Sequence, residues 1–339
     1  MRIRFFVALL SCLALTGTVA VDSARADPSR VTLERPRVDG DVAVLRGRAP
    51  AGAKIRTVRK TPAGWRRIAA AHLQTASRLS PDACGKRRRK EDGTLWRCTF
   101  VDNFNGTTLD TSKWLVQETS ASGVTNGRSC YVDTPSAIKV EGGSLLLSAQ
   151  LHHDDFTCES PYGDFTTDRT SATVTTKGRF NQTLGRFAFR AKMPTTRVKG
   201  AHPALWLYPD GQKYGRWPLS GEIDVAEWYS ALPEQVFPSV HYIDGLNDIH
   251  TGKRGRFADV SDWHVYELEW TSKTMRFYYD HKLIWEHTWA PLAPLIGTQP
   301  FDQPFNVVLT QAWGGLWNAP TEATPHRVTM AVDWVRVWK

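Results

Sequence analysis

From about residue 99 to its end, this 339-residue chain is built of short runs in which apolar and polar residues alternate. Gly, Asp and Asn separate the runs, and no stretch keeps a helical period over the length of a globular helix. Many short strands at regular spacing predict an all-β fold, an antiparallel sandwich or jelly roll. The candidate strands are 144–149, 170–176, 186–192, 222–229, 263–270, 275–279, 305–311 and 329–338.

Residues 27–80 differ from this main region. They hold four short alternating runs with turn signals between them, such as Asp39-Gly40. A segment of roughly 50 residues is marginal as an independent domain. We therefore expect a small β-rich accessory segment at 27–80, either a module or a lead-in docked on the main domain at 81–339.

The first 26 residues have the pattern of an export signal. Arg2 and Arg4 precede an apolar run, and the small residues around Arg25 offer a cleavage site before Asp27. A cut after Ala20 is an alternative, while a lipoprotein site at Cys12 is less favoured because it comes too early. No later segment is apolar enough to span a membrane. The sequence thus predicts a secreted protein with no membrane contact after cleavage.

Four of the five cysteines follow the predicted signal, namely Cys84, Cys98, Cys130 and Cys158. An even number in an exported chain suggests two disulfides. Three pairings are open, and proximity in sequence favours Cys84–Cys98 and Cys130–Cys158. The spacing of a structural zinc site is absent.

Loss of the signal lowers the formal net charge from +9 to about +7, because three arginines and one aspartate leave with it. The basic excess includes the run Lys86–Lys90. Such a run suits a polyanion, but it contains no aromatic residue and is more typical of a solvated loop. We therefore expect no nucleic-acid partner, and we expect a monomer.

The segment from Gly221 to Trp228 places three acids among apolar residues. Strand side chains alternate between faces, so Glu222 and Asp224 share one face. Glu227 lies five residues beyond Glu222, and a regular strand would point it to the opposite face. One extra residue in a β-bulge near Val225-Ala226 would bring all three acids to the same face.

Three carboxylates on one face repel one another, which raises at least one pKa and creates a proton donor beside an anion. A retaining glycosidase uses such a pair, with carboxyls about 5–5.5 Å apart. Two alternatives are an acidic stripe on a solvated strand and a calcium site built from clustered carboxylates. The apolar residues between the acids favour a strand backed by the core.

The segment Gly221–Glu227 resembles the signature of glycoside hydrolase family 16, in the bulged form of its laminarinase-like branch. The similarity runs from about residue 99 to 338, with motifs in consistent order. The other matching segments are Asp102–Gly106 with Leu109, Asp110 and Trp114, Gly185–Lys192, His202–Trp206, Trp217-Pro218, Val240–Tyr242, Tyr266–Trp270 and Val332–Val337.

The resemblance implies a jelly-roll sandwich whose concave face forms a cleft for polysaccharide. In it Glu222 would be the nucleophile, Glu227 the general acid/base and Asp224 the supporting acid. The resemblance further implies double displacement, in which Glu222 attacks the anomeric carbon and Glu227 first protonates the leaving oxygen and then activates water.

Five other residues match family positions that contact sugar. Trp206 and Trp217 would line subsites on the non-reducing side of the cut, with core packing as the alternative for Trp206. Arg190 and His241 would bind sugar hydroxyls near the cut, although one His or Arg on a strand is often structural. Trp313, with Trp317, would form one wall of the cleft, where relatives often carry a smaller residue in place of Trp313.

Many relatives hold a calcium ion on the convex face, and the matching residues here are Asn103, Gly143 and Asp333. Asn103 replaces the more common acidic residue, and the loss of one charge weakens such a site. The resemblance therefore implies no cofactor for catalysis and leaves a structural calcium ion open.

The leading hypothesis is endo-hydrolysis of β-1,3-glucan of the laminarin type, with or without mixed β-1,3/1,4 links. The same covalent intermediate would also permit transglycosylation, and the fold serves galactans in other family members. A glucan-binding protein without activity is the non-enzymatic alternative. It is disfavoured because such proteins lose the catalytic glutamates, and both are present here.

Overall fold

The computed structural model describes residues 81–339 in detail, except 91, 245–248, 252, 253, 258 and 293, and gives only the backbone for 249–251. Within residues 1–80 it describes the backbone of seven strands. The chain divides into two compact units, Met1–Ser80 and Pro81–Lys339.

The first unit contains two small antiparallel sheets. One joins β1 (Ile3–Ala8), β3 (Thr32–Leu33), β4 (Arg37–Asp39) and β5 (Val42–Arg48), and the other joins β2 (Gly17–Asp22), β6 (Lys54–Thr61) and β7 (Gly64–His72). The four alternating runs of 27–80 fall on strands of these sheets. The cleavage sites proposed near residues 20 and 26, and Cys12, concern side chains outside the described residues, so the export signal remains a prediction.

The second unit is an all-β jelly-roll sandwich, as predicted. Its back sheet, a name we keep below, contains seven main strands together with the edge strand β8 (Cys98–Asp102). In spatial order the seven are β11 (Ile138–Glu141), β12 (Ser144–Cys158), β24 (Arg327–Trp338), β14 (Gly185–Lys192), β20 (His264–Trp270), β21 (Met275–Tyr279) and β22 (Lys282–His287).

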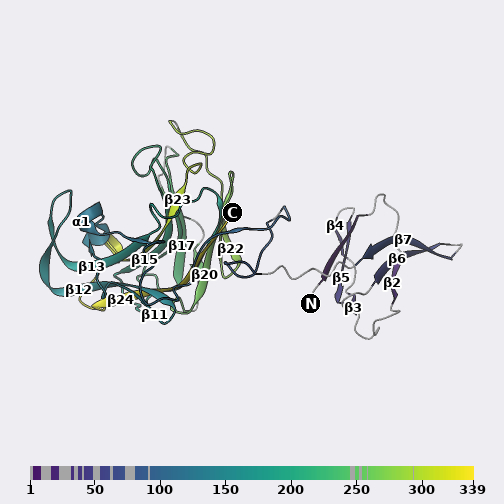
Figure 1. Cartoon of the computed structure of the whole chain (residues 1–339), viewed down its shortest axis with the longest axis horizontal. Coiled ribbons are helices and arrows are strands. Elements are labelled where there is room, and N and C mark those ends of the chain that lie inside the picture. Colours follow the sequence, from purple (N-terminus) through teal and green to yellow (C-terminus); the bar gives the residue numbers. More distant parts are fainter. Residues whose placement is uncertain are drawn as a thin grey trace. The chain divides into compact units, whose positions relative to one another are not determined.

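The front sheet faces the back sheet across the core. Its strands in spatial order are β9 (Leu115–Val116), β13 (Phe165–Thr175), β23 (Phe305–Trp313), β15 (Ala201–Pro209), β16 (Glu222–Trp228) and β17 (Gln235–His241), with the short β18 (Ile249–Thr251) and β19 (Gly255–Arg256) at the edge. In Figure 1, β15, β17 and β23 lie in one layer and β11, β12 and β24 in the other.

The strand β13 connects the two sheets because its first half pairs with β12 and its second half with β23. Ladders are antiparallel apart from the short parallel pair of β10 (Cys130–Tyr131) with β13. Among the described residues of this unit the helical elements are single turns: α1 (Thr119–Ser122), η2 (Asn126–Arg128) and η3 (Leu316–Asn318). In the part of the chain that is described, no helix has the length and apolar character to cross a bilayer.

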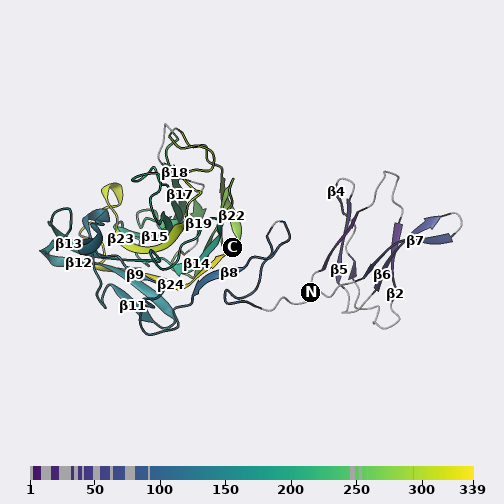
Figure 2. The same ribbon diagram turned by 45° about the horizontal axis from the view of Figure 1, so that its top comes forward.

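One continuous apolar core separates the sheets. Phe187 and Phe189 of β14 and Leu205 and Leu207 of β15 all belong to this core, and each has no exposed surface. Alternate residues of the same strands turn away from it, which gives each sheet an outer face. Figure 2 shows β15 and β23 on one side of this space and β24 and β11 on the other.

Both predicted disulfides are confirmed. Cys84 bonds to Cys98 and Cys130 bonds to Cys158. The first closes the loop that carries the basic run, and Cys84 packs there with Trp96 and Trp338 in a small second core. The basic run is therefore part of a folded loop at the edge of the back sheet.

Candidate active site

The strand β16 carries the three acids, and its ladders contain the predicted bulge. Towards β17, Asp224 pairs with Ser239 and Glu227 pairs with Phe237, so two residues of β16 face one residue of β17 between those pairs. The same shift appears towards β15, where Asp224 pairs with Trp206 and Glu227 with Ala204. The extra residue restores the alternation, and all three acids lie on the outer face of the front sheet.

Buried residues hold this bulge from behind. Ile223, Val225 and Ala226 have no exposed surface and belong to the core. The hydroxyl of Tyr279, on β21 of the back sheet, crosses the core and donates a hydrogen bond of 3.0 Å to the carbonyl of Val225. Gly255 makes room for Tyr279, since a Cβ there would lie 2.3 Å from the tyrosine ring.

The entry to β16 also requires glycine. Gly221 has φ +78°, a left-handed conformation, and a Cβ there would lie 2.8 Å from the ring of Phe301. This turn starts the strand one residue before Glu222. It therefore fixes where the first acid leaves the backbone.

Three side chains surround the carboxylate of Glu227. Tyr229 donates to its Oε1 at 2.8 Å, Ser239 donates to its Oε2 at 2.7 Å, and Nε2 of His202 lies 3.3 Å from Oε1. The imidazole of His202 is stacked on the ring of Tyr229 at 4.3 Å, so the two side chains hold each other in place. The position of Glu227 is therefore fixed from three directions.

The other two acids share a histidine. Nε2 of His241 lies 3.0 Å from Oδ2 of Asp224 and 3.6 Å from Oε1 of Glu222. Asp224 is 3% exposed and His241 is 9% exposed, so this contact is shielded from water. The structure thus places His241 beside the acids. The contact with sugar hydroxyls that the resemblance implies for His241 stays a prediction.

Burial and repulsion set the pKa values of these groups. Burial raises the pKa of Glu222 well above its usual value, and the charges of Asp224 and Glu227 raise it further, against the opposing effect of His241. Burial and the charge of Glu227 likewise raise the pKa of Asp224. Burial alone would also raise the pKa of Glu227. The hydrogen bond and the charge of His202, together with the hydrogen bonds from Ser239 and Tyr229, outweigh burial and lower this pKa overall.

The directions of these shifts favour a proton on the Glu222–Asp224 side and negative charge on Glu227 in the free protein. Because the acids repel one another, neutralising Glu222 favours a charged Glu227, and ionising Glu222 favours a protonated Glu227. Glu227 can therefore act first as an acid and then as a base as the charge on Glu222 changes.

Aromatic side chains lie around the acids on the same face. Trp217 is 44% exposed, and its ring centroid is 5.4 Å from that of His241. Trp206 is half-buried, donates from Nε1 to Thr310 at 3.0 Å and meets Tyr208 edge to face. Burial and the charge of Glu222 raise the pKa of Tyr208, which places this phenol within the field of the acids.

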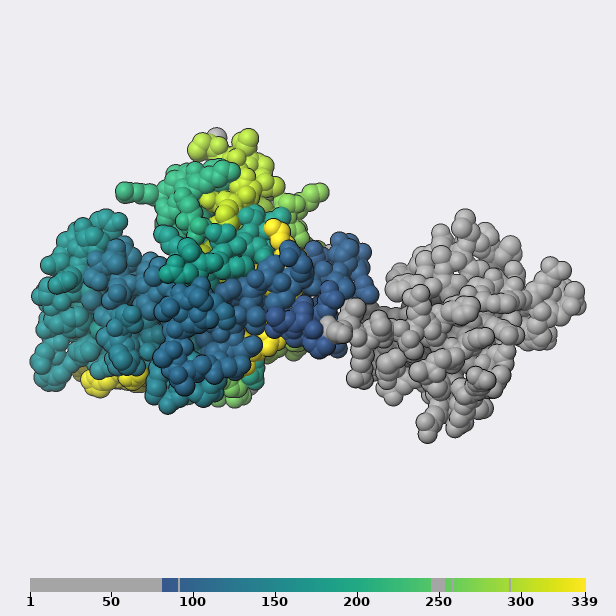
Figure 3. Space-filling model, viewed as in Figure 1, coloured from purple at the N-terminus to yellow at the C-terminus, as the bar shows by residue number. Residues whose placement is uncertain are grey.

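The surface of the unit is hollowed. In the view of Figure 3, the hollow separates the lobe that carries α1 and the β12–β13 connection from a lobe of later segments, drawn green to yellow-green. Three acids and an exposed indole on one face suit an extended ligand of many hydroxyl groups.

Comparison with known proteins identifies the family. The family profile "Glycosyl hydrolases family 16" matches residues 130–336. The chain belongs to glycoside hydrolase family 16.

Individual relatives agree with this assignment. The chain is 32% identical to a β-glucanase of Rhodothermus marinus over 269 residues, which cover 74% of this chain and 88% of the relative. It is 33% identical to glucan endo-1,3-β-glucosidase A1 of Niallia circulans over 262 residues, which are 71% of this chain but only 37% of that longer protein. The laminarinase catalytic domain of Thermotoga maritima MSB8 superposes with a TM-score of 0.62 at 28% identity, covering 72% of this chain and 98% of the domain.

One family-based expectation fails at Trp313. This residue is fully buried in the core, so it does not form a wall of the cleft. The register explains the error: Ala312 pairs with His202 of the open face, and Trp313 pairs with the buried Ala201. The exposed indole of this segment is Trp317, 55% exposed and 5.0 Å from the ring of Tyr229.

A second expectation fails at Arg190. This arginine lies on β14 of the back sheet, on the face opposite Phe189 and the core. Its guanidinium pairs with Asp333 and lies 4.9 Å above the ring of Trp263. It is therefore not brought together with the acids, and its partners explain why a charged residue is placed there.

The predicted calcium ligands do not fit a cation in this structure. Asp333 is already paired with Arg190, and the side-chain oxygen of Asn103 accepts a hydrogen bond of 3.1 Å from Arg336. Two guanidinium groups at the two side-chain ligands oppose a divalent ion, and Gly143 would add only a carbonyl.

Two other groups of described residues come close enough to share a metal. Glu222, Asp224 and His241 form one, and Asp82 with Cys84 and Cys98 form the other. The second has no free thiolate, because its cysteines form a disulfide.

Four residues around the acids were not predicted from the sequence, namely His202, Tyr229, Ser239 and Tyr208. Strand alternation could have indicated His202 and Tyr229. Tyr229 follows Glu227 by two residues, and His202 precedes Ala204, the partner of Glu227 on β15, by two residues. Ser239 was not, because its place beside Glu227 depends on the register of β17.

Proposed function

We propose that this protein is a retaining endo-β-1,3-glucanase with Glu222 as nucleophile and Glu227 as general acid/base. The observation that supports this most strongly is the bulge in β16, which gathers three carboxyls on the open face of the front sheet. The relatives named as glucan endo-1,3-β-glucosidase and laminarinase supply the substrate class.

In the first step Glu222, ionised when the sugar is bound, attacks the anomeric carbon and displaces the leaving sugar. Its negative charge keeps a proton on Glu227, which passes that proton to the departing oxygen. In the second step Glu222 is neutral as a glycosyl ester. Glu227 then remains a stable anion, held by Tyr229 and Ser239, and takes a proton from the attacking water.

Asp224 and His241 support the nucleophile. Asp224 is buried between the two glutamates, and a protonated Asp224 can donate to Glu222 and favour its ionised form. His241 contacts both acids and offsets part of their repulsion. These two residues therefore tune the charge of Glu222 and do not react themselves.

Trp217 and Trp206 provide aromatic surface for glucose rings, beside His241 and Tyr208 respectively. Of the two, Trp217 has the larger open face, since Trp206 is half-buried and uses its Nε1 within the sheet. We place sugar binding on the outer face of the front sheet. Export through residues 1–26 and action as a monomer outside the cell complete the proposal, and the two disulfides are consistent with an oxidising compartment.

The test is a panel of soluble polysaccharides with a reducing-end assay and linkage analysis, on wild type, Glu222→Gln and Glu227→Gln. We expect cleavage of laminarin and a loss of several orders of magnitude in rate for each variant. Adding an oligosaccharide acceptor distinguishes hydrolysis from transglycosylation by product size. Near-normal activity of Glu222→Gln would exclude the assigned nucleophile, and activity on galactans without activity on laminarin would exclude the substrate.

A further inference from the structure

A cavity opens on the other sheet, where two neighbouring strands separate. β14 pairs with β24 only as far as Lys192 opposite Ala331, and beyond this point the backbone N–H of Met193 bonds to Val260 instead. β24 extends further, to Arg327, alongside β12. The space between the separated segments has a volume of about 340 Å³.

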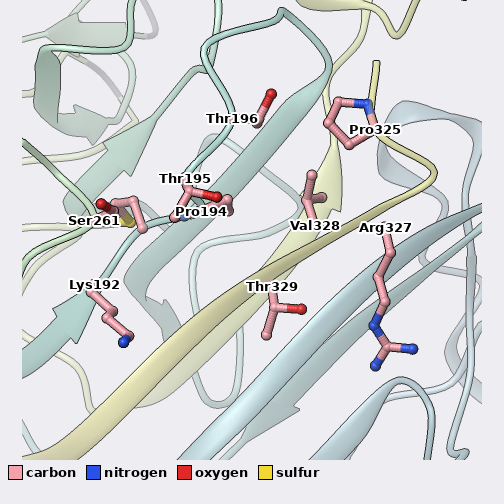
Figure 4. A pocket seen from close by; sticks show the side chains of 10 residues that line it. Lys192, Pro194, Thr195, Thr196, Ser261, Pro325, Arg327, Val328 and Thr329 are labelled. Carbon is pink, nitrogen blue, oxygen red and sulfur yellow. The ribbon is translucent and has the colours of Figure 1, made fainter. Parts of the chain in front are cut away.

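The lining combines three kinds of group. Figure 4 draws all ten lining residues and labels each of them apart from Met193. Hydroxyls come from Thr195, Thr196, Ser261 and Thr329, apolar surface from Met193, Pro194, Pro325 and Val328, and positive charge from Lys192 and Arg327. In this view Lys192 and Arg327 lie on opposite sides of Thr329, and Ser261 and Thr195 lie on the side of Lys192. No carboxylate lines this cavity.

Both cations are held in position by other groups. Arg327 donates to the carbonyl of Ser136 and, at 3.0 Å, to the hydroxyl of Ser148 on β12. The ammonium of Lys192 lies 5.1 Å above the ring of Trp263. Within the described residues neither cation is paired with a carboxylate, so each retains charge and donors for a ligand.

Asp259, two residues before the lining residue Ser261, is already used in a turn. One carboxylate oxygen of Asp259 accepts hydrogen bonds from the backbone N–H and the hydroxyl of Ser261, which closes this turn. The four hydroxyls of the lining can donate and accept hydrogen bonds, and the two cations give the cavity a positive charge that no lining carboxylate offsets. A ligand with negative charge therefore fits better than a neutral one.

We propose that this cavity is a second carbohydrate site that binds a sugar unit carrying a carboxylate, a uronate. The positive charge of the two cations would attract the carboxylate, with only one of them in direct contact with it, because Lys192 stands opposite Ala331 and Arg327 four residues further along β24. The hydroxyls would bond the ring hydroxyls, and the prolines with Val328 would contact the C–H face of the pyranose. The volume is at the lower end of ligand pockets, which span about 300–1,000 Å³, and exceeds the need of an inorganic anion. The site lies on the back sheet, so it is independent of the catalytic proposal.

The experiment is calorimetric titration of the full chain with sodium D-glucuronate, D-glucose, sodium acetate and inorganic phosphate. We expect binding of glucuronate, at least tenfold weaker binding of the other three, and at least tenfold weaker glucuronate binding by Lys192→Gln. Lys273→Gln, which removes an exposed lysine at a turn of the same sheet outside the cavity, is the matched control and should bind as wild type does. Arg327→Lys, which keeps the charge, should retain more affinity than Arg327→Gln.

Each outcome decides the proposal. Equal binding of glucose and glucuronate would exclude the role of charge, and equal binding of phosphate or acetate would reduce the site to a general anion site. No glucuronate binding, or binding unchanged in Lys192→Gln, would overturn the proposal. Laminarin cleavage by Lys192→Gln should equal that of wild type. A failure of activity in every protein would count against the catalytic proposal and leave the titration result valid.

Discussion

The hydrogen bond from Tyr279 to the bulge gives a sharp test of how the site is built. The substitution Tyr279→Phe removes one hydroxyl and leaves the carbonyl of Val225 buried without its donor. An unsatisfied buried polar group costs about 1–3 kcal/mol. In a domain of this size 1 kcal/mol corresponds to about 2–4 °C, so a cost near 2 kcal/mol lowers the Tm by about 4–8 °C.

The same substitution should also lower the catalytic rate, because Val225 lies between Asp224 and Glu227 in the strand. A displacement of about 1 Å in a catalytic group can cost on the order of a hundredfold in rate. We therefore expect kcat on laminarin to fall by about tenfold to a hundredfold, with KM little changed. Burial raises the pKa of Tyr279 well above its usual value, so the phenol remains a donor throughout the accessible pH range.

Tyr266 supplies the control. It is equally buried, its ring centroid is 5.1 Å from that of Tyr279, and its hydroxyl has no hydrogen-bond partner among the described residues. Tyr266→Phe should therefore leave Tm and kcat unchanged or raise Tm slightly. If the two variants behave alike in calorimetry and in the rate assay, the bond to Val225 does not hold the catalytic strand.

Three further predictions concern the acid/base residue, the tryptophans and calcium. Ser239→Ala removes a donor that lowers the pKa of Glu227, so that pKa should rise and the acidic limb of the kcat/KM profile, which Glu227 sets as the group with the lower pKa, should move to higher pH; an unmoved limb would contradict the role of Glu227. Trp313→Ala should lower the free energy of unfolding by about 3–5 kcal/mol, because the side chain is fully buried. Trp317→Ala should change that free energy by less than about 0.5 kcal/mol, and urea titrations of both variants check the contrast. EDTA should leave the Tm unchanged, since arginines occupy the side chains of Asn103 and Asp333; a clear drop that calcium reverses would refute this.

Local patterns predicted the parts of this fold that depend on neighbours in sequence. The bulge follows from the spacing of Glu222, Asp224 and Glu227 alone, because the alternation of a strand leaves no other way to gather them. The disulfides followed from proximity in the chain. Trp313 was placed wrongly because its orientation depends on pairing with β15, more than one hundred residues away. Arg190 was placed wrongly because strand alternation does not reveal which of two sheets a strand joins.

The bulge in β16 also bears on how this strand tolerates changes of length. If Val225 were deleted, Glu222, Asp224 and the shifted glutamate would alternate regularly, and all three acids would still share one face. The extra residue is therefore not needed to keep the acids together. Its effect is on direction, since a bulge adds right-handed twist and turns everything beyond it about the strand axis. A single-residue deletion would rotate the glutamate, together with Tyr229, away from Ser239 of β17 and His202 of β15, so the angle at which a proton reaches the sugar is set by one residue of chain length.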